Sequence, residues 1–258
     1  MSLESTRYAK KIASAFNKGT LIAPLPIKFT KKSSEANKFR TECEKLITSP
    51  VIGFKAGGTG KPMLKKLGER EPFCAAIFKK NLLKSNGSVK INKYTLGIEL
   101  EVFYQVKKSF FSNSKKITEK NVSSVVSHMG PCIEVVGYRQ KKKGLTYLGD
   151  LISDFGANVK FIIGKKQKFK KLKFNNLATS LYNKKSGQVA NGNTKTVYDS
   201  PLKSLIWLLN KIKKNKIDLN KDFLVFTGST VGVVPIQKTG LFKGEIKSLG
   251  SVKTKIKN

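Results

Sequence analysis

The chain has 258 residues, enough for one well-buried core, and its 39% hydrophobic content is typical of a folded protein rather than a disordered one. Its longest apolar runs are too short to cross a bilayer, and its three cysteines lack the spacing of a zinc site. A formal net charge of +35 suggests binding to polyanions, but only four of the 51 basic residues are arginines, the type that nucleic-acid surfaces favour. We therefore attribute the positive charge to a composition biased toward lysine, and expect it to cause only non-specific binding to nucleic acid. The alternative is a dedicated site for a polyanion.

The first part of the chain is predicted to be helical. Apolar side chains recur at helical spacing over residues 2–18, and Gly19 follows as a stop signal. Prolines make 21–26 an extended connector. A second helix is expected over 33–47, begun by a serine cap. We expect residues 1–50 to form a helical N-terminal subdomain.

The remainder mixes strands with a few helices. A helical stretch is expected at 122–128, and Pro201 suits the first turn of a helix that continues to Lys214. Alternating and β-branched patterns predict strands or strand-rich stretches at 51–55, 73–107, 131–136, 150–164, 169–175, 180–189, 223–229 and 244–257. Without an internal repeat or a clear linker, 1–258 is interpreted as a single α+β domain.

Three acidic residues stand alone in apolar strands. Glu99 and Glu101 are two positions apart in one strand, so their carboxylates point to the same side, and Glu134 lies in another short apolar strand. Neighbouring carboxylates repel each other, and a buried charge without a partner is costly. Mg²⁺ or Mn²⁺, which prefer carboxylate oxygen, would remove both penalties. The alternative is an edge strand whose glutamates face water or lysines.

Lys55 is a second candidate, because it ends an apolar strand just before a loop that contains Gly57, Gly58 and Gly60. Glycine backbone can approach a ligand closely, and a desolvated lysine can bind a carboxylate or move a proton. The alternative is that Lys55 is an ordinary surface lysine without a role in binding or catalysis. The loop lacks the GKS/T spacing of a Walker motif.

The chain resembles the 2-oxopent-4-enoate hydratase and 4-oxalocrotonate decarboxylase branch of the fumarylacetoacetate hydrolase superfamily. The E-x-E of Glu99 and Glu101 with a downstream P-x-x-E is the specific part of the resemblance. The matching segments run nearly end to end, at 22–24, 52–55, 97–101, 131–136, 150–154, 201–211, 227–229 and 249–252. The resemblance implies a mixed β-sheet folded back on itself, as in the C-terminal domain of fumarylacetoacetase, with an N-terminal helical segment.

The resemblance also implies a function. Glu99, Glu101 and Glu134 would hold Mg²⁺ or Mn²⁺, and the metal would chelate a small 2-oxo acid. A hydratase would add water to a 2-hydroxy-2,4-dienoate or 2-oxo-4-enoate to give a 4-hydroxy-2-oxo acid. A decarboxylase, or a catalytically altered member that binds polyanions such as RNA, is the alternative. Lys55 and Glu71 would be catalytic, and the residues lining the substrate site would be Gly57, Asp154, Thr227 and Ser229.

Two departures from the family pattern concern proton transfer. Phe73 stands where hydratases of the family often carry an acid, which leaves Glu71 as the substitute, and Phe155 replaces a usual asparagine. The implied protein is a cytoplasmic homo-oligomer of aromatic catabolism, with no membrane association.

Overall fold

The computed structural model describes residues 2–170 and 174–258. Its α-helices are Leu3–Lys18 (α1), Ser33–Lys45 (α2), Lys61–Lys66 (α3), Ser109–Ser112 (α4), Val122–Val125 (α5), Leu148–Ile152 (α6) and Pro201–Lys214 (α7). Short 3-10 turns occur at Ile27–Phe29, Lys79–Asn81, Phe155–Ala157, Phe174–Asn176 and Thr194–Thr196. No helix in the described ranges has the length and apolar character needed to cross a membrane.

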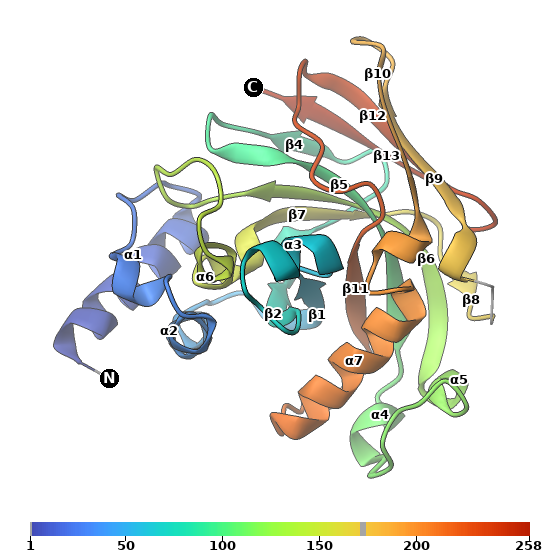
Figure 1. Ribbon diagram of the computed structural model, residues 1–258, viewed down its shortest axis with the longest axis horizontal. Coiled ribbons are helices and arrows are strands. Elements are labelled where there is room, and N and C mark those ends of the chain that lie inside the picture. The colour runs from blue at the N-terminus through green and yellow to red at the C-terminus, as the bar shows by residue number, and fades with distance from the viewer. Residues whose placement is uncertain (1, 171–173) are drawn as a thin grey trace.

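Two mixed sheets make up the body of the protein (Figure 1). The larger has the order β2-β1-β11-β5-β6-β7-β3, with β8 paired to β6, and the smaller has the order β10-β9-β12-β13-β4. Most neighbours are antiparallel, whereas β1–β11, β3–β7 and β13–β4 are parallel. The strands are Val51–Gly57 (β1), Phe73–Phe78 (β2), Leu82–Lys84 (β3), Ser88–Lys90 (β4), Thr95–Val106 (β5), Val126–Gly137 (β6), Asn158–Ile163 (β7), Gln167–Lys168 (β8), Ala178–Asn183 (β9), Gln188–Asn193 (β10), Phe223–Ser229 (β11), Gly240–Ile246 (β12) and Gly250–Lys257 (β13).

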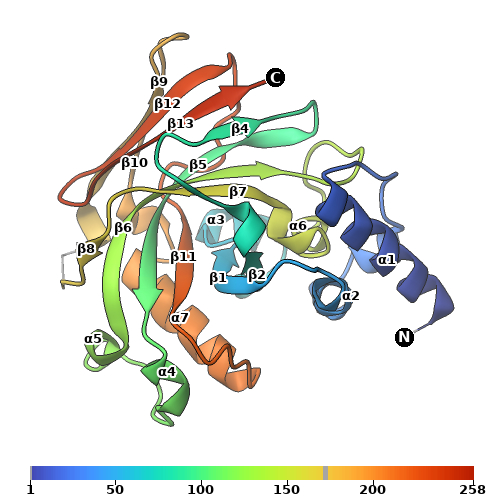
Figure 2. The same ribbon diagram turned by 180° about the vertical axis from the view of Figure 1, so that it is seen from behind.

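The long strands β5 and β6 run through the middle of the larger sheet, and β12 and β13 of the smaller sheet pack against β6 (Figures 1 and 2). A sheet that curls over itself in this way can bury one face of its central strands without a covering helix. The arrangement confirms the predicted α+β class. It also places the middle of β5 and β6 deep inside the protein.

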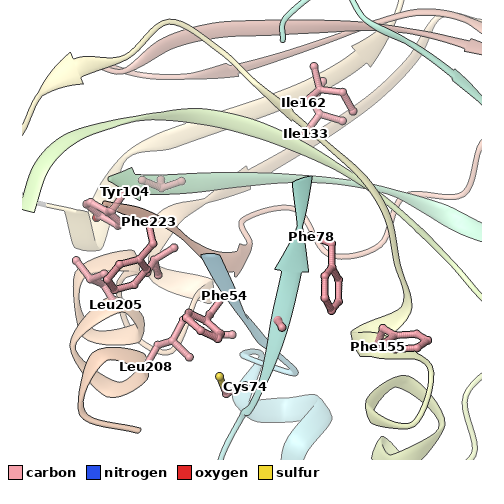
Figure 3. Packing of buried hydrophobic residues seen from close by; sticks show 14 of the residues in the cluster. Phe54, Cys74, Phe78, Tyr104, Ile133, Phe155, Ile162, Leu205, Leu208 and Phe223 are labelled. Carbon is pink, nitrogen blue, oxygen red and sulfur yellow. The ribbon is translucent and has the colours of Figure 1, made fainter. Parts of the chain in front are cut away.

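Helix α7 packs against another part of the larger sheet, over β11 and β1. The hydroxyl of Ser200 caps its first turn by accepting a hydrogen bond from a backbone N–H, as an N-cap serine should. Its buried leucines face the sheet, where Leu208 approaches Phe54 and Leu205 approaches Phe223 (Figure 3). Fully burying each such side chain stabilises the fold by about 1.5–3 kcal/mol. The predicted helix from Pro201 is confirmed.

Helix α1 is joined to the sheet by aromatic packing. Ser2 caps its first turn and Gly19, with φ of 71°, ends it in the left-handed conformation. Phe16 lies on the buried face of α1. The centroid of its ring is 5.2 Å from that of the Phe78 ring and 4.8 Å from that of the Phe155 ring. Both α1 and α2 lie at one end of the molecule, on the same side as α6 (Figure 1).

Several predicted boundaries are wrong. The stretch 122–128 is helical only to Val125, and the chain then enters β6, so that its last residue, His128, is in a strand. In 150–164 only 158–163 is a strand, because the first residues complete α6. Residues 180–189 span a turn between β9 and β10. The predicted strand 169–175 lies partly outside the described residues.

Candidate metal centre and active-site cavity

The pairing of β5 with β6 brings the three predicted glutamates together. Glu99 and Glu101 share one face of β5, and Glu99 is the direct cross-strand partner of Glu134 on β6. One carboxylate oxygen from each lies within 4.8 Å of the other two. Like charges opposite each other normally destabilise a sheet, so this cluster requires a compensating cation.

Burial increases that requirement. Glu101 and Glu134 are fully buried, and among the described residues Glu101 Oε1 and Glu134 Oε2 find no hydrogen-bond partner. Burial, followed by the charge of Glu134, raises the pKa of Glu99 to about 7, and the same two causes raise the pKa of Glu101 well above its usual value. Three crowded carboxylates with two free oxygens form a donor set that fits a hard divalent cation such as Mg²⁺ or Mn²⁺.

Lys55 supplies one positive charge to this cluster. Its ammonium Nζ lies 2.5 Å from Glu134 Oε1 and donates a second hydrogen bond, of 3.1 Å, to the carbonyl oxygen of Gly156. Burial alone would lower the pKa of Lys55, but the three glutamates around it raise the pKa above its usual value. One cation faces three carboxylates, so the lysine does not neutralise the cluster.

A strained turn aims the carbonyl of Gly156 at this lysine. Phe155, Gly156 and Ala157 all have positive φ, at 54°, 75° and 54°. For residues with a side chain this conformation costs of order 1–3 kcal/mol each, so it persists only where packing imposes it. Phe155 is fully buried and its ring contacts that of Phe16, which fixes the turn from outside the cavity.

The Thr-Gly-Ser segment at the end of β11 supplies a donor to the cluster. The register between β11 and β5 shifts between Phe226 and Ser229, and at this irregularity the N–H of Gly228 donates to Glu101 Oε2 at 2.9 Å. Only glycine suits this position, because its φ is 102° and an added Cβ would lie 2.0 Å from Thr59 Oγ1.

The substitution Gly228→Ala tests this contact. We expect it to destabilise the protein by about 1–3 kcal/mol and to weaken Mn²⁺ binding by about 10–100-fold, because Glu101 loses the donor that orients it. Chemical denaturation and Mn²⁺ titration followed by thermal melting measure the two effects. Gly187→Ala is the matched control, since Gly187 has φ of 66° in a turn with open space around it. Equal Mn²⁺ affinity in both variants would contradict the orienting role.

A cavity of about 650 Å³ opens onto the cluster. The carboxylates of Glu99 and Glu101, together with Lys55, lie in its wall, whereas Glu134 is buried behind Lys55. Much of the remaining wall is apolar side chains and glycine backbone. Such a site, with a few charged groups converging at one place in an apolar cavity, is typical of small-molecule binding.

Two further predicted residues line the cavity. Gly57 makes room for the ring of Phe73, because a Cβ on Gly57 would lie 2.1 Å from Phe73 Cζ. The aromatic residue at the position where the resemblance suggests an acid is therefore buried in the wall. Ser229 also lines the cavity, and its hydroxyl donates to the carbonyl of Gly232.

The structure does not bring Glu71, Thr227 or Asp154 into the cavity wall. Glu71 lies on the surface, where it forms an ion pair with Lys211 at 2.6 Å and accepts a hydrogen bond from the Trp207 indole. The hydroxyl of Thr227 donates instead to the backbone of β5. The loop before β2 turns Glu71 toward α7, so it does not take the place of the missing acid near the carboxylates.

Asp154 belongs to a buried ion-pair network next to the strained turn. Its Oδ1 lies 3.0 Å from the guanidinium of Arg139, and its Oδ2 accepts from the backbone N–H of Arg139 and from the Gln140 amide. The guanidinium of Arg139 also stacks over Phe16, 4.5 Å from the ring centroid. Asp154 therefore ties the segment that follows β6 to the turn, and Arg139 connects both to helix α1.

Asp154→Ala is expected to destabilise the protein by about 3–5 kcal/mol, because Arg139 would be left buried without its counter-charge. Urea denaturation measures the loss. In the double variant Asp154→Ala/Arg139→Met much of the stability should return, since no buried charge is left unpaired. A stable Asp154→Ala protein with a raised KM would instead support direct contact with a substrate.

The sequence interpretation missed the roles of Gly156 and Gly228. Gly228 stood inside the Thr-Gly-Ser segment, where a glycine at the end of a strand pattern is a signal for an irregularity. No local signal marks Gly156 as a partner of Lys55, because the two residues are 101 positions apart.

The chain is similar along most of its length to known proteins. No protein-family model matches it. It is 20% identical over 255 residues to a 2-keto-4-pentenoate hydratase of Paraburkholderia xenovorans (strain LB400), covering 97% of this chain and 94% of the relative. It is 22% identical over 205 residues to a 2-keto-4-pentenoate hydratase of Burkholderia vietnamiensis, covering 79% and 77%.

Solved structures share the fold. A 4-oxalocrotonate decarboxylase from Pseudomonas putida G7, complexed with magnesium and adipate, superposes with a TM-score of 0.81 at 18% identity, covering 98% of this chain and 97% of that one. A fumarylpyruvate hydrolase from Pseudomonas aeruginosa, in complex with Mn²⁺ and pyruvate, gives 0.58 at 15% identity and covers 81% and 90%. The similarity confirms the predicted fold.

Proposed function

Because the chain belongs to the fumarylacetoacetate hydrolase superfamily, in the branch of the 2-keto-4-pentenoate hydratases and 4-oxalocrotonate decarboxylase, we propose that it is a metal-dependent hydratase. It would add water to a 2-hydroxy-2,4-dienoate or 2-oxo-4-enoate to give a 4-hydroxy-2-oxo acid. The single observation that carries the proposal is the cluster of Glu99, Glu101 and Glu134, with two unpartnered oxygens and one lysine, at an apolar cavity.

In this proposal Glu99, Glu101 and Glu134 hold Mg²⁺ or Mn²⁺. A divalent cation bound there would supply Lewis-acid stabilisation of the negative charge that develops on the substrate's 2-oxo group. The N–H of Gly228 holds the Glu101 carboxylate in place, so that this ligand is oriented before substrate arrives.

Lys55 is the proton-carrying group nearest the cluster. An ammonium has three donors, and Nζ uses two of them on Glu134 and the Gly156 carbonyl, which leaves one for a substrate in the cavity. We propose that this N–H binds the substrate and donates its proton to the dienoate carbon skeleton, which leaves a neutral amine on Lys55. The side chain of Phe73 has no proton to give, so in this proposal Lys55 carries the task that an acid at that position would share.

Loss of the ultraviolet absorbance of a 2-hydroxydienoate, measured with Mg²⁺ or Mn²⁺ and after chelation, tests the proposal. We expect rapid metal-dependent loss. Equal, slow loss under both conditions would contradict catalysis.

A decarboxylase of 2-oxo acids is the second candidate, favoured by the fold match to 4-oxalocrotonate decarboxylase over nearly the whole of both chains. Decarboxylation would use the same charge stabilisation at the 2-oxo group but would release CO₂. Measuring CO₂ against the hydrated product distinguishes the two reactions.

We also propose that the enzyme acts in the cytoplasm as a homo-oligomer. The three cysteines are buried and unpaired, which agrees with a reducing compartment. Light scattering at several salt concentrations tests assembly, because a net charge of +35 makes association sensitive to screening.

A further inference from the structure

The cavity contains very little positive charge for so basic a protein. The chain carries 51 Lys and Arg residues, yet among the described residues that line the cavity Lys55 is the single one of either type. Its ammonium is already paired with Glu134. A ligand with one carboxylate can be accommodated by Lys55 and a metal ion, but a second carboxylate farther along the cavity would find no cation.

Much of the cavity wall beyond the carboxylates is apolar, and its polar residues are uncharged: Thr59, Asn191, Thr196, Ser229 and Thr230. The apolar part includes Met63, Leu96, Leu145, Leu151, Val231 and Val233. A volume of about 650 Å³ lies within the range of sites for drug-sized ligands and exceeds what a five-carbon acid needs. A carboxylate desolvated in such a place without a partner would lose several kcal/mol of hydration.

Two large apolar side chains are exposed where they line this cavity. Leu145 is 36% exposed and Val233 is 46% exposed, and they come from two different loops. The loop of Val233 is fixed to β5, because Ile98 and Val234 exchange both backbone hydrogen bonds at 2.9 Å. Gly97 permits this close approach, since a Cβ there would lie 2.8 Å from Val233 Cγ1. Val233 is thus held beside the strand that carries Glu99.

We propose that the substrate is a monocarboxylic 2-hydroxydienoate whose distal end carries an alkyl or aryl group, and that Val233 and Leu145 select this group. This inference rests on the proposed function, because the charged end of the substrate is assigned to the glutamate cluster and Lys55. The apolar end then lies along the wall of the cavity, where burial of each methylene favours binding.

Kinetics on three substrates tests the inference: the five-carbon 2-hydroxydienoate, its propyl-extended homologue, and a dienoate of matching length that ends in a carboxylate. We expect kcat/KM to be about 10-fold or more higher for the propyl homologue than for the five-carbon acid. For the dicarboxylate we expect kcat/KM to be at least about 10-fold lower than for the propyl homologue.

Val233→Lys places a cation at the exposed side of the cavity. It should raise kcat/KM for the dicarboxylate by about 10-fold and lower it for the propyl homologue by a similar factor. Val189→Lys is the matched control, because Val189 is an exposed valine on β10 that does not line the cavity. The control should leave both values unchanged.

Binding without turnover provides an independent measurement. Thermal melts with Mn²⁺ should show larger stabilisation by 2-oxooctanoate than by pyruvate or 2-oxoadipate. Turnover with preference for the dicarboxylate would overturn the tail inference and leave the proposed function standing. Failure to turn over or bind any of these acids would overturn both, and identical behaviour of Val233→Lys and Val189→Lys would remove Val233 from the specificity site.

Discussion

Replacing Glu101 with glutamine is expected to abolish stabilisation by Mn²⁺ and, at the same time, to raise the stability of the metal-free protein. The carboxyl of Glu101 is fully buried, and burial together with Glu134 and Glu99 raises its pKa well above the usual value. The ionised form is therefore unfavourable in the folded protein without a cation. An amide of the same shape removes one of three repelling charges but also one of three anionic ligands.

Thermal melts with and without Mn²⁺ measure both effects. For the unaltered protein, saturation to 100 times the dissociation constant should stabilise by about 2.7 kcal/mol, and for Glu101→Gln this gain should vanish. Turnover should fall by about 100-fold or more. Glu245→Gln is the control, since Glu245 is a half-exposed carboxylate paired with Lys243 on β12. A metal-free Glu101→Gln protein that is less stable and still responds to Mn²⁺ would show that the carboxylate is structural.

Lys55→Met is expected to separate catalysis from metal binding. Turnover should fall by about 10²–10⁴-fold, because no other described side chain in the cavity wall supplies a proton-carrying cation. The metal-free protein should lose about 3–5 kcal/mol, since Glu134 loses its counter-charge at 2.5 Å. Mn²⁺ affinity should be retained or increased, because the site becomes more negative.

Single-turnover absorbance and Mn²⁺ titration of the same preparation distinguish these effects. Lys160→Met is a suitable control, because Lys160 is a partly buried lysine of β7 that donates to the backbone carbonyl of Lys80, in the 3-10 turn before β3. If Lys55→Met kept its turnover while losing Mn²⁺ binding, the lysine would be a support for the metal cluster and not a group that moves a proton.

The elements with strong local signals could be predicted from sequence. Helix Pro201–Lys214 has an N-cap serine, a proline in its first turn and a single apolar face, and strand Phe223–Ser229 is a short apolar run that ends at a glycine. The predicted strand 150–164 wrongly includes residues 150–152, the last part of helix Leu148–Ile152, because a short apolar run fits the period of a strand as well as that of a helix.

The candidate site was only partly accessible to the same reasoning. That Glu99 and Glu101 share a face follows from the period of a strand. Their position opposite Glu134 depends on the register of β5 against β6, which is set by pairing between residues far apart in sequence. The isolated acid in a short apolar strand indicates Glu134 as a partner, and the resemblance supports it. The surface position of Glu71 depends on the path of a loop, which no local pattern records.

The turn at Phe155–Ala157 connects the N-terminal helix to the lysine beside the glutamate cluster. Its left-handed backbone presents the Gly156 carbonyl to Lys55, and the Phe155 ring that stabilises it rests on Phe16 of α1. A chain shortened at its N-terminus would release this ring and let the turn relax. Residues of α1, which are far from Lys55 in the sequence, thereby help to set the direction in which the Lys55 ammonium points.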